Sequence, residues 1–124
     1  MGSILVYVSA ALVALWGVAH AVPTRQVLAG FEPITVDNRR VILQEWLAEA
    51  FTMWGLAAVV TVAAIVGGTH AEGTDWVCRV AAALLVALAG LTTLTGARTP
   101  VIWFKICPVL LAVSATLLLV ASFQ

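Results

Sequence analysis

Two glutamates, Glu45 and Glu49, lie four residues apart at the start of a long apolar stretch. On a helix this spacing puts both carboxyl groups on one face, with β-carbons about 5–6 Å apart. Ionisable side chains are costly near a bilayer and by default indicate a site. Two carboxylates this close in a poorly solvated place do not both ionise easily, so one is expected to keep its proton. Such a group can act in general acid–base catalysis.

The alternative is that the start of this helix protrudes from the membrane. Glu45 then lies at the interface, and Glu49 lies about 6 Å deeper along the helix axis. Apolar residues dominate the sequence after Glu49, so Glu49 is the sharper candidate of the two. Basic residues could instead neutralise both carboxylates and leave them as structural partners; the candidates for this pairing are Arg25, Arg98 and Lys105.

His20 belongs to a stripe at helical spacing on the first apolar stretch, together with Ser9, Val13 and Trp16. Polar residues on a spanning helix turn toward protein, so we expect this stripe to face the bundle. The imidazole titrates near neutral pH, which suits proton transfer or pairing with a glutamate. The alternative is that His20 is only an amphipathic residue at a helix end. We therefore predict Glu49, Glu45 and His20 as the catalytic residues.

One histidine and two glutamates could also bind a divalent metal. The spacing lacks the Glu-x-x-His pairs of di-iron bundles, so we expect neither a metal nor a cofactor. Further polar and aromatic residues near these helix ends could bind a substrate: Trp16, Arg25, Asn38, Trp46, Thr52, Trp54, Arg98 and Lys105. Aromatic walls with a few polar groups are typical of a pocket for a lipophilic molecule. Interfacial anchoring and ordinary helix packing explain the same tryptophans.

The rest of the chain indicates which elements must position these residues. It has 124 residues, of which 63% are hydrophobic and 10% charged, whereas soluble domains are about half apolar and about a quarter charged. Four stretches reach the roughly 20 mostly apolar residues of a spanning helix: about 3–21, 41–67, 77–95 and 104–123. We predict an all-α polytopic membrane protein, with residues 1–124 forming one four-transmembrane-helix bundle. The net charge is zero, and no nucleic-acid partner is expected.

Basic residues predict the orientation of the bundle in the membrane. The first and third connections, with the start of the fourth span, contain five of the six basic residues: Arg25, Arg39, Arg40, Arg98 and Lys105. The opposite side has only Arg79. We therefore expect a bacterial cytoplasmic membrane, with the two connections in the cytoplasm and both termini outside. The outer residues His70, Glu72, Asp75 and Arg79 are expected to form a solvated loop.

The connection over residues 22–40 has two prolines and one glycine, yet several of its residues are apolar. This composition favours a segment that lies in the membrane interface or folds over the mouth of the bundle as a lid. Asp37 is the expected N-cap of the second span, because its carboxylate can accept hydrogen bonds from the first free amides.

The third span is rich in small residues, which permit close helix packing and predict a central position or a homo-oligomer contact. These residues are Ala82, Ala83, Ala87, Ala89, Gly90 and Thr93. Cys78 and Cys107 fall at opposite ends of their spans. A bilayer core about 30 Å thick separates them, so no disulfide is expected.

In length and number of spans the chain resembles the small multidrug resistance transporters, whose signature is a carboxylate in the first span. Here the acids lie in the second span. It also resembles DoxX-like proteins and the EXPERA group, which includes sterol isomerases. Our leading hypothesis is a membrane enzyme of isomerase, cyclase or epoxide-opening type, or a binding protein for a lipophilic small molecule. The alternatives are a proton-coupled transporter that works as an oligomer and a structural subunit of a larger complex.

Overall fold

In a computed structural model, which describes residues 1–124, the chain is built from helices alone. The four long helices are α1 (Gly2–Ala21), α3 (Val36–Gly67), α4 (Glu72–Leu94) and α5 (Ile102–Ala121). Two short elements interrupt the connections: α2 (Thr24–Ala29) and the 3-10 turn η1 (Gly96–Arg98). All four long helices are long and apolar enough to cross a membrane, which confirms the predicted four-helix membrane bundle.

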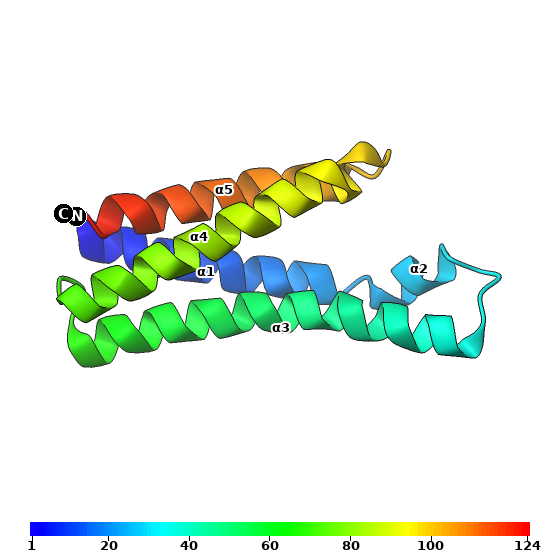
Figure 1. Cartoon of the computed structure of the whole chain (residues 1–124), viewed down its shortest axis with the longest axis horizontal. Helices are drawn as coiled ribbons and strands as arrows, with labels where there is room; N and C mark the ends of the chain where they lie inside the picture. Colours follow the sequence, from blue (N-terminus) through cyan, green and yellow to red (C-terminus); the bar gives the residue numbers. More distant parts are fainter.

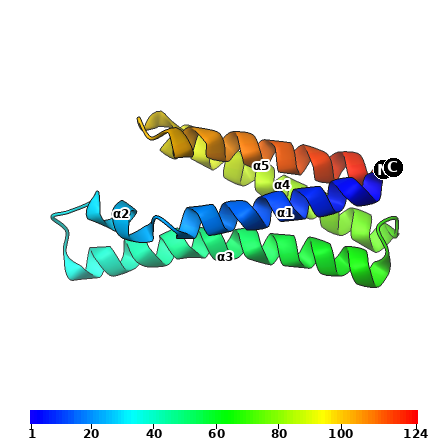
Figure 2. The ribbon, with the colours of Figure 1, turned by 180° about the vertical axis from the view of Figure 1, so that it is seen from behind.

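The two ends of the bundle have different contents (Figures 1 and 2). One end carries both chain termini and the short turn between α3 and α4; we call it the terminal end. The other end carries α2 and η1, and we call it the α2 end. This arrangement matches the predicted up-and-down order of spans, and the side of the membrane that each end faces stays a prediction.

Helix α1 packs between α3 and α5, and α4 packs along α5. Gly17 permits the close approach of α1 to α3, because a β-carbon there would lie only 2.6 Å from Nε1 of Trp54. The Trp54 indole N–H donates a hydrogen bond to the carbonyl of Ala14 across the same contact, at 3.1 Å. Small residues bring membrane helices together in this way. Trp54, predicted as a substrate-binding residue, is used here to join two helices.

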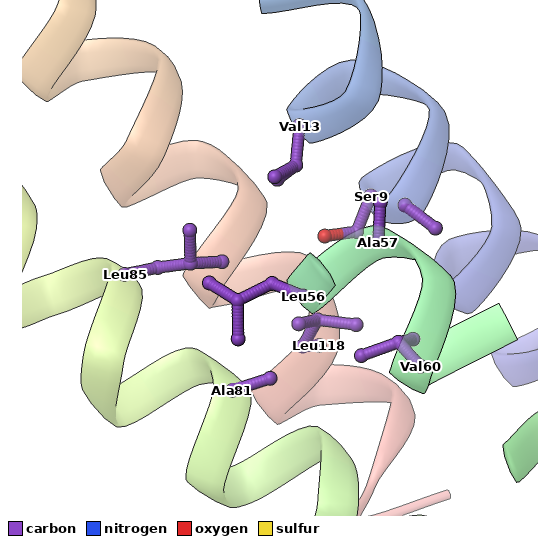
Figure 3. A pocket seen from close by; sticks show the side chains of 9 residues that line it. Ser9, Val13, Leu56, Ala57, Val60, Ala81, Leu85 and Leu118 are labelled. Carbon is purple, nitrogen blue, oxygen red and sulfur yellow. The ribbon is translucent and has the colours of Figure 1, made fainter. Parts of the chain in front are cut away.

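The middle of the bundle is filled by side chains from all four long helices. Met53, Leu85 and Leu111 are fully buried there. A cavity in the same part of the bundle measures about 10 Å³ and is lined by Ser9, Leu56, Leu85 and their neighbours (Figure 3). That is about the space that one water molecule needs. The terminal end and the α2 end are therefore separated by a packed layer.

The helices extend further than the apolar stretches from which we predicted them. Helix α3 begins at Val36 instead of Val41, and α4 begins at Glu72 instead of Val77. Its 32 residues make α3 about 48 Å long, well beyond the roughly 30 Å core of a bilayer. Polar residues can extend a spanning helix into the headgroup layer, and a hydropathy pattern alone does not mark that extension.

The predicted N-cap of α3 is wrong. Thr35 occupies that position, and its Oγ1 accepts a hydrogen bond from the backbone N–H of Asn38 at 3.2 Å. Asp37 lies inside the first turn, where its carboxylate favours the positive end of the helix and lies 3.4 Å from Arg40. Threonine and aspartate are both good N-caps, so the sequence did not discriminate between them.

The connection over residues 22–40 contains more regular structure than we predicted. Helix α2 buries Leu28 and packs against α3. An ion pair of 2.6 Å between Arg39 of α3 and Glu32 fastens the segment after α2. Closure of this segment over a site stays a prediction.

Helix α4 presents its small residues on two faces. Ala82 and Ala89 are buried, whereas Ala83, Ala87 and Gly90 are exposed. The predicted oligomer contact through this helix is untested. Cys78 and Cys107 are both buried and free.

Candidate functional site

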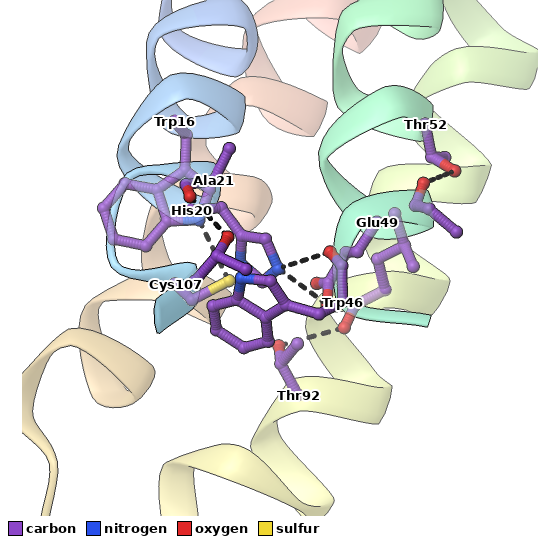
Figure 4. Close-up of polar contacts among 11 residues, drawn as sticks. Trp16, His20, Ala21, Trp46, Glu49, Thr52, Thr92 and Cys107 are labelled. Carbon is purple, nitrogen blue, oxygen red and sulfur yellow. Dashed lines mark hydrogen bonds and ion pairs between the residues drawn. The ribbon is translucent and has the colours of Figure 1, made fainter. Parts of the chain in front are cut away.

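His20 lies in the last turn of α1, at the α2 end of the bundle, and is only 9% exposed. Its ring stacks on that of Trp46 from α3, with the centroids 3.8 Å apart and the planes 20° from parallel. Because the acceptor is a backbone carbonyl, His20 must donate its Nε2–H to Trp46 O, at 3.1 Å. The same nitrogen lies 3.6 Å from Oε2 of Glu49 (Figure 4). His20 thus faces the inside of the bundle, as we predicted.

Glu49 leans toward His20 from α3 and keeps 28% of its side chain exposed. The 3.6 Å separation between the carboxylate and His20 is longer than a good hydrogen bond. The other two ion pairs of the chain, Arg39–Glu32 and Arg40–Asp37, lie outside this contact. No lysine or arginine lies within 4.0 Å of the Glu49 carboxylate, so its charge has only a histidine as partner.

Glu45 has different surroundings from Glu49. It is exposed, and its carboxylate accepts a weak hydrogen bond from Nε2 of Gln44 at 3.4 Å. This is what the alternative of a protruding helix start predicted. The two glutamates therefore do not share one buried environment, and only Glu49 contacts His20.

Residues from α5 and α4 complete the surroundings of the pair. Phe104 meets the Trp46 ring edge-on, with centroids 6.0 Å apart. The Trp16 indole N–H donates to Sγ of Cys107 at 3.2 Å, and Thr92 lies next to this group (Figure 4). The Trp46 indole nitrogen is buried without a hydrogen-bond partner, which is uncommon for a buried polar atom.

We did not predict Phe104, Cys107 and Thr92 as site residues. Phe104 and Cys107 occupy the first two turns of the fourth span, at the same end as His20. Their depth in the membrane, which is similar to that of His20, could have identified them as site residues. Thr92 gave no signal of its own, because threonine is common in membrane helices and here bonds to the Leu88 carbonyl at 2.9 Å.

The remaining predicted binding residues are not brought to Glu49. The Thr52 hydroxyl donates to the Ala48 carbonyl at 2.8 Å, within its own helix. Asn38 is exposed and takes part in the N-cap through its backbone. Arg25, Arg98 and Lys105 are exposed, and none forms an ion pair within 4.0 Å. The predicted neutralisation of the glutamates by these three cations is therefore not present in the structure.

At the terminal end, Arg79 departs from the predicted solvated loop. Its guanidinium donates to the carbonyl and the hydroxyl of Ser122, at 2.8 and 3.3 Å. It also lies 5.1 Å from the centre of the Trp76 ring and 4.6 Å from that of Phe123. Arg79 thus fastens the end of α5 to α4. This pairing could not be predicted from local spacing, because Ser122 is 43 residues away.

The arrangement at the α2 end brings together a histidine, one carboxylate and three aromatic rings. No group of three or more histidine, cysteine, aspartate or glutamate side chains is placed to hold a metal ion. Proton exchange and ion pairing are the chemistry available to His20 and Glu49. Comparison of the chain with protein-family models, with curated proteins and with solved structures finds no match.

Proposed function

We propose that this membrane protein binds a lipophilic small molecule at the α2 end and exchanges a proton with it through Glu49, with His20 as its partner. The reaction would be an isomerisation, a cyclisation or an epoxide opening if the protein is an enzyme, because acid–base groups alone can drive these steps. We further propose that the α2 end faces the cytoplasm, since five of the six basic residues lie there.

The contact between His20 and Glu49 carries this proposal. A carboxylate with 28% exposure lies 3.6 Å from a buried imidazole, and no lysine or arginine fixes its charge. A carboxylate paired with arginine would stay ionised and inert. Glu49 has no such partner within 4.0 Å, and a carboxyl group that no fixed cation holds is what proton exchange requires.

The packed middle of the bundle favours a site open to one side over a transport path through a single chain. Met53, Leu85 and Leu111 fill the layer between the two ends, and its cavity of about 10 Å³ has no room for a solute. A transporter would therefore need a second conformation or a path between chains.

Labelling with dicyclohexylcarbodiimide tests the proposal. This lipid-soluble reagent adds a protonated carboxyl group across its C=N bond: the proton goes to nitrogen, and the carboxyl oxygen bonds to carbon. The acyl group then shifts to nitrogen and leaves a stable N-acylurea that peptide mass spectrometry can locate. We expect labelling of Glu49 in membrane vesicles, faster as the pH falls, and none in the Glu49→Gln variant. A water-soluble carbodiimide with an added amine should modify exposed Glu45 instead.

The matched control is Glu72→Gln, which makes the same chemical change at an exposed position of the terminal end. It should leave labelling of Glu49 unchanged. If Glu49 resists the lipid-soluble reagent at every pH, the carboxyl group does not take up a proton in the membrane, and the proposed acid–base role is wrong.

A further inference from the structure

We infer that the hairpin between α4 and α5 binds an anionic phospholipid through Arg98 and Lys105. The acidic headgroup would contact the two cations, and an acyl chain would lie along the outer face of α5. Neither cation forms an ion pair with Glu49. The inference therefore concerns a second surface of the protein and is independent of the proton-exchange proposal.

The charges of the chain are divided unevenly along its sequence. Residues 76–124 contain Arg79, Arg98 and Lys105 but no aspartate or glutamate, so all six acidic residues lie before this part of the chain. Arg79 is hydrogen-bonded within the protein at the terminal end. Arg98 and Lys105 are exposed and form no ion pair within 4.0 Å. The two cations of this hairpin are therefore free to pair with an anion from outside the chain.

The depth of these cations in the membrane indicates which anion they meet. Helix α5 has 20 residues and is about 30 Å long, which matches the hydrocarbon core of a bilayer. Arg98 belongs to η1, which packs on the first turn of α5, because a β-carbon at Gly96 would lie 3.5 Å from Cβ of Phe104. Lys105 lies about 4.5 Å inside the helix, and a lysine stem can bring its ammonium group back to the headgroups. Both cations can therefore reach the level of the lipid phosphates.

The face of α5 that carries Lys105 is suited to an acyl chain. Val109 and Val113 follow Lys105 at a spacing of four residues, so the three side chains share one face of the helix. The two valines are 63% and 48% exposed. Trp103 is 64% exposed near the two cations, and tryptophan is enriched where headgroups meet hydrocarbon. A soluble phosphate would use the cations alone, whereas a phospholipid uses the cations and this apolar face together.

The other side of the α2 end has a different balance of charge. Helix α2 and the start of α3 extend past η1 (Figures 1 and 2). The two cations of this part of α3 are already paired, Arg39 with Glu32 and Arg40 with Asp37. An acidic headgroup would have to displace a carboxylate there. At the hairpin it meets unpaired cations, so the hairpin is the favoured place for it.

Native mass spectrometry tests this inference. The protein is titrated in maltoside micelles with phosphatidylglycerol, which is anionic, or with phosphatidylcholine of the same acyl chains, which has no net charge. The masses of the lipid-bound and lipid-free protein give a dissociation constant for the first lipid. We expect phosphatidylglycerol to bind at least about tenfold more tightly. This preference should decrease as the ammonium acetate concentration rises, because salt screens exposed charges.

Variants locate the lipid on the protein. Arg98→Gln and Lys105→Gln should each weaken the binding of phosphatidylglycerol about fivefold and leave that of phosphatidylcholine unchanged. Lys105→Arg keeps the charge and should keep the preference. The matched control is Arg39→Gln, which makes the same change of charge at the same end of the bundle, at a residue that is already paired with Glu32. It should also keep the preference. Circular dichroism establishes that each variant is folded before binding is compared.

Equal binding of the two lipids would overturn the inference. So would a loss of preference in Arg39→Gln as large as that in Lys105→Gln, because binding would then follow the net charge of the protein alone. Displacement of phosphatidylglycerol by an equal concentration of glycerol phosphate would show that the acyl chain contributes nothing, and the ligand would not be a lipid. Glu49→Gln should keep the preference, and its loss there would contradict the placement of the lipid at the hairpin.

Discussion

Arg79 and Glu49 are both charged side chains on membrane-spanning helices, and they lie toward opposite ends of the bundle. The guanidinium of Arg79 has several partners within the protein: it donates two hydrogen bonds to Ser122 and lies against two aromatic rings. Glu49 has a single partner, His20, at 3.6 Å. Placing a charged side chain in a membrane costs free energy at both positions. Only at Arg79 is this cost offset by contacts that fasten two helices together.

Under the proposed function, the difference is one between a structural charge, Arg79, and a reactive one, Glu49. A charged group that is saturated by hydrogen bonds is held in one protonation state and one geometry. A group with an incomplete set of partners can change its protonation or accept a ligand. Replacing each group should therefore affect different properties, and the free energy of unfolding in mixed dodecyl sulfate micelles provides a common scale.

Arg79→Met should have the largest effect on stability. The substitution keeps an apolar stem but removes two hydrogen bonds from a charged donor, so we expect a loss of about 1.5–3 kcal/mol. Arg79→Lys keeps the charge without the fork of donors and should recover only part of the loss. Carbodiimide labelling of Glu49 should not change. If Arg79→Met unfolds at the same dodecyl sulfate concentration as the unmodified protein, then Arg79 does not fasten α4 to α5.

Gly17→Ala tests the contact that sets the distance between α1 and α3, and hence between His20 and Glu49. The added methyl group would lie 2.6 Å from Nε1 and 2.8 Å from Cδ1 of Trp54, so the indole or the helices must move. Overpacking of this kind costs about 1–3 kcal/mol. Gly55→Ala is the matched control on α3, because nothing lies within 4 Å of a β-carbon there. An equal effect of the two substitutions would contradict a specific contact at Gly17.

The sequence predicted the fold well, because four long apolar stretches admit few arrangements in a bilayer. It also predicted that His20 faces the bundle, where His20 contacts Glu49. The role of Glu49 as a site residue stays a prediction. The sequence did not predict the rotation of α3 about its axis, which decides which of its side chains contact other helices. Trp54 and Thr52 share the deeper part of α3, yet one bonds to α1 and the other to its own helix.

Long-range partners explain the remaining errors. Cys107 meets Trp16 across 91 residues, and Arg79 meets Ser122 across 43. No local spacing encodes such pairs. The start of α3 was predicted too late for a related reason: a helix continues past the membrane as long as its backbone is satisfied, and Thr35 supplies that cap. Hydropathy measures where a helix can be buried, not where it begins.

His20→Phe should have a smaller effect than either of the first two substitutions. Phenylalanine can keep the stacking on Trp46, but it removes the donor to the Trp46 carbonyl and the partner of Glu49. We expect a loss of about 1 kcal/mol, as for one buried hydrogen bond. His20→Ala, which also removes the stacking, should cost more. If the two variants are equally stable, the ring contact contributes nothing, and His20 serves only through its nitrogen atoms.

Glu49→Gln should have the smallest effect on stability, about 0.5 kcal/mol or less, because an ion pair that is this long and partly exposed contributes little. The same variant should lose carbodiimide labelling altogether. If Glu49 can be replaced without loss of stability and its replacement removes the labelling, its role is functional and not structural. The opposite result, a loss of stability as large as that of Arg79→Met, would make Glu49 a second structural charge and remove the distinction between the two ends of the bundle.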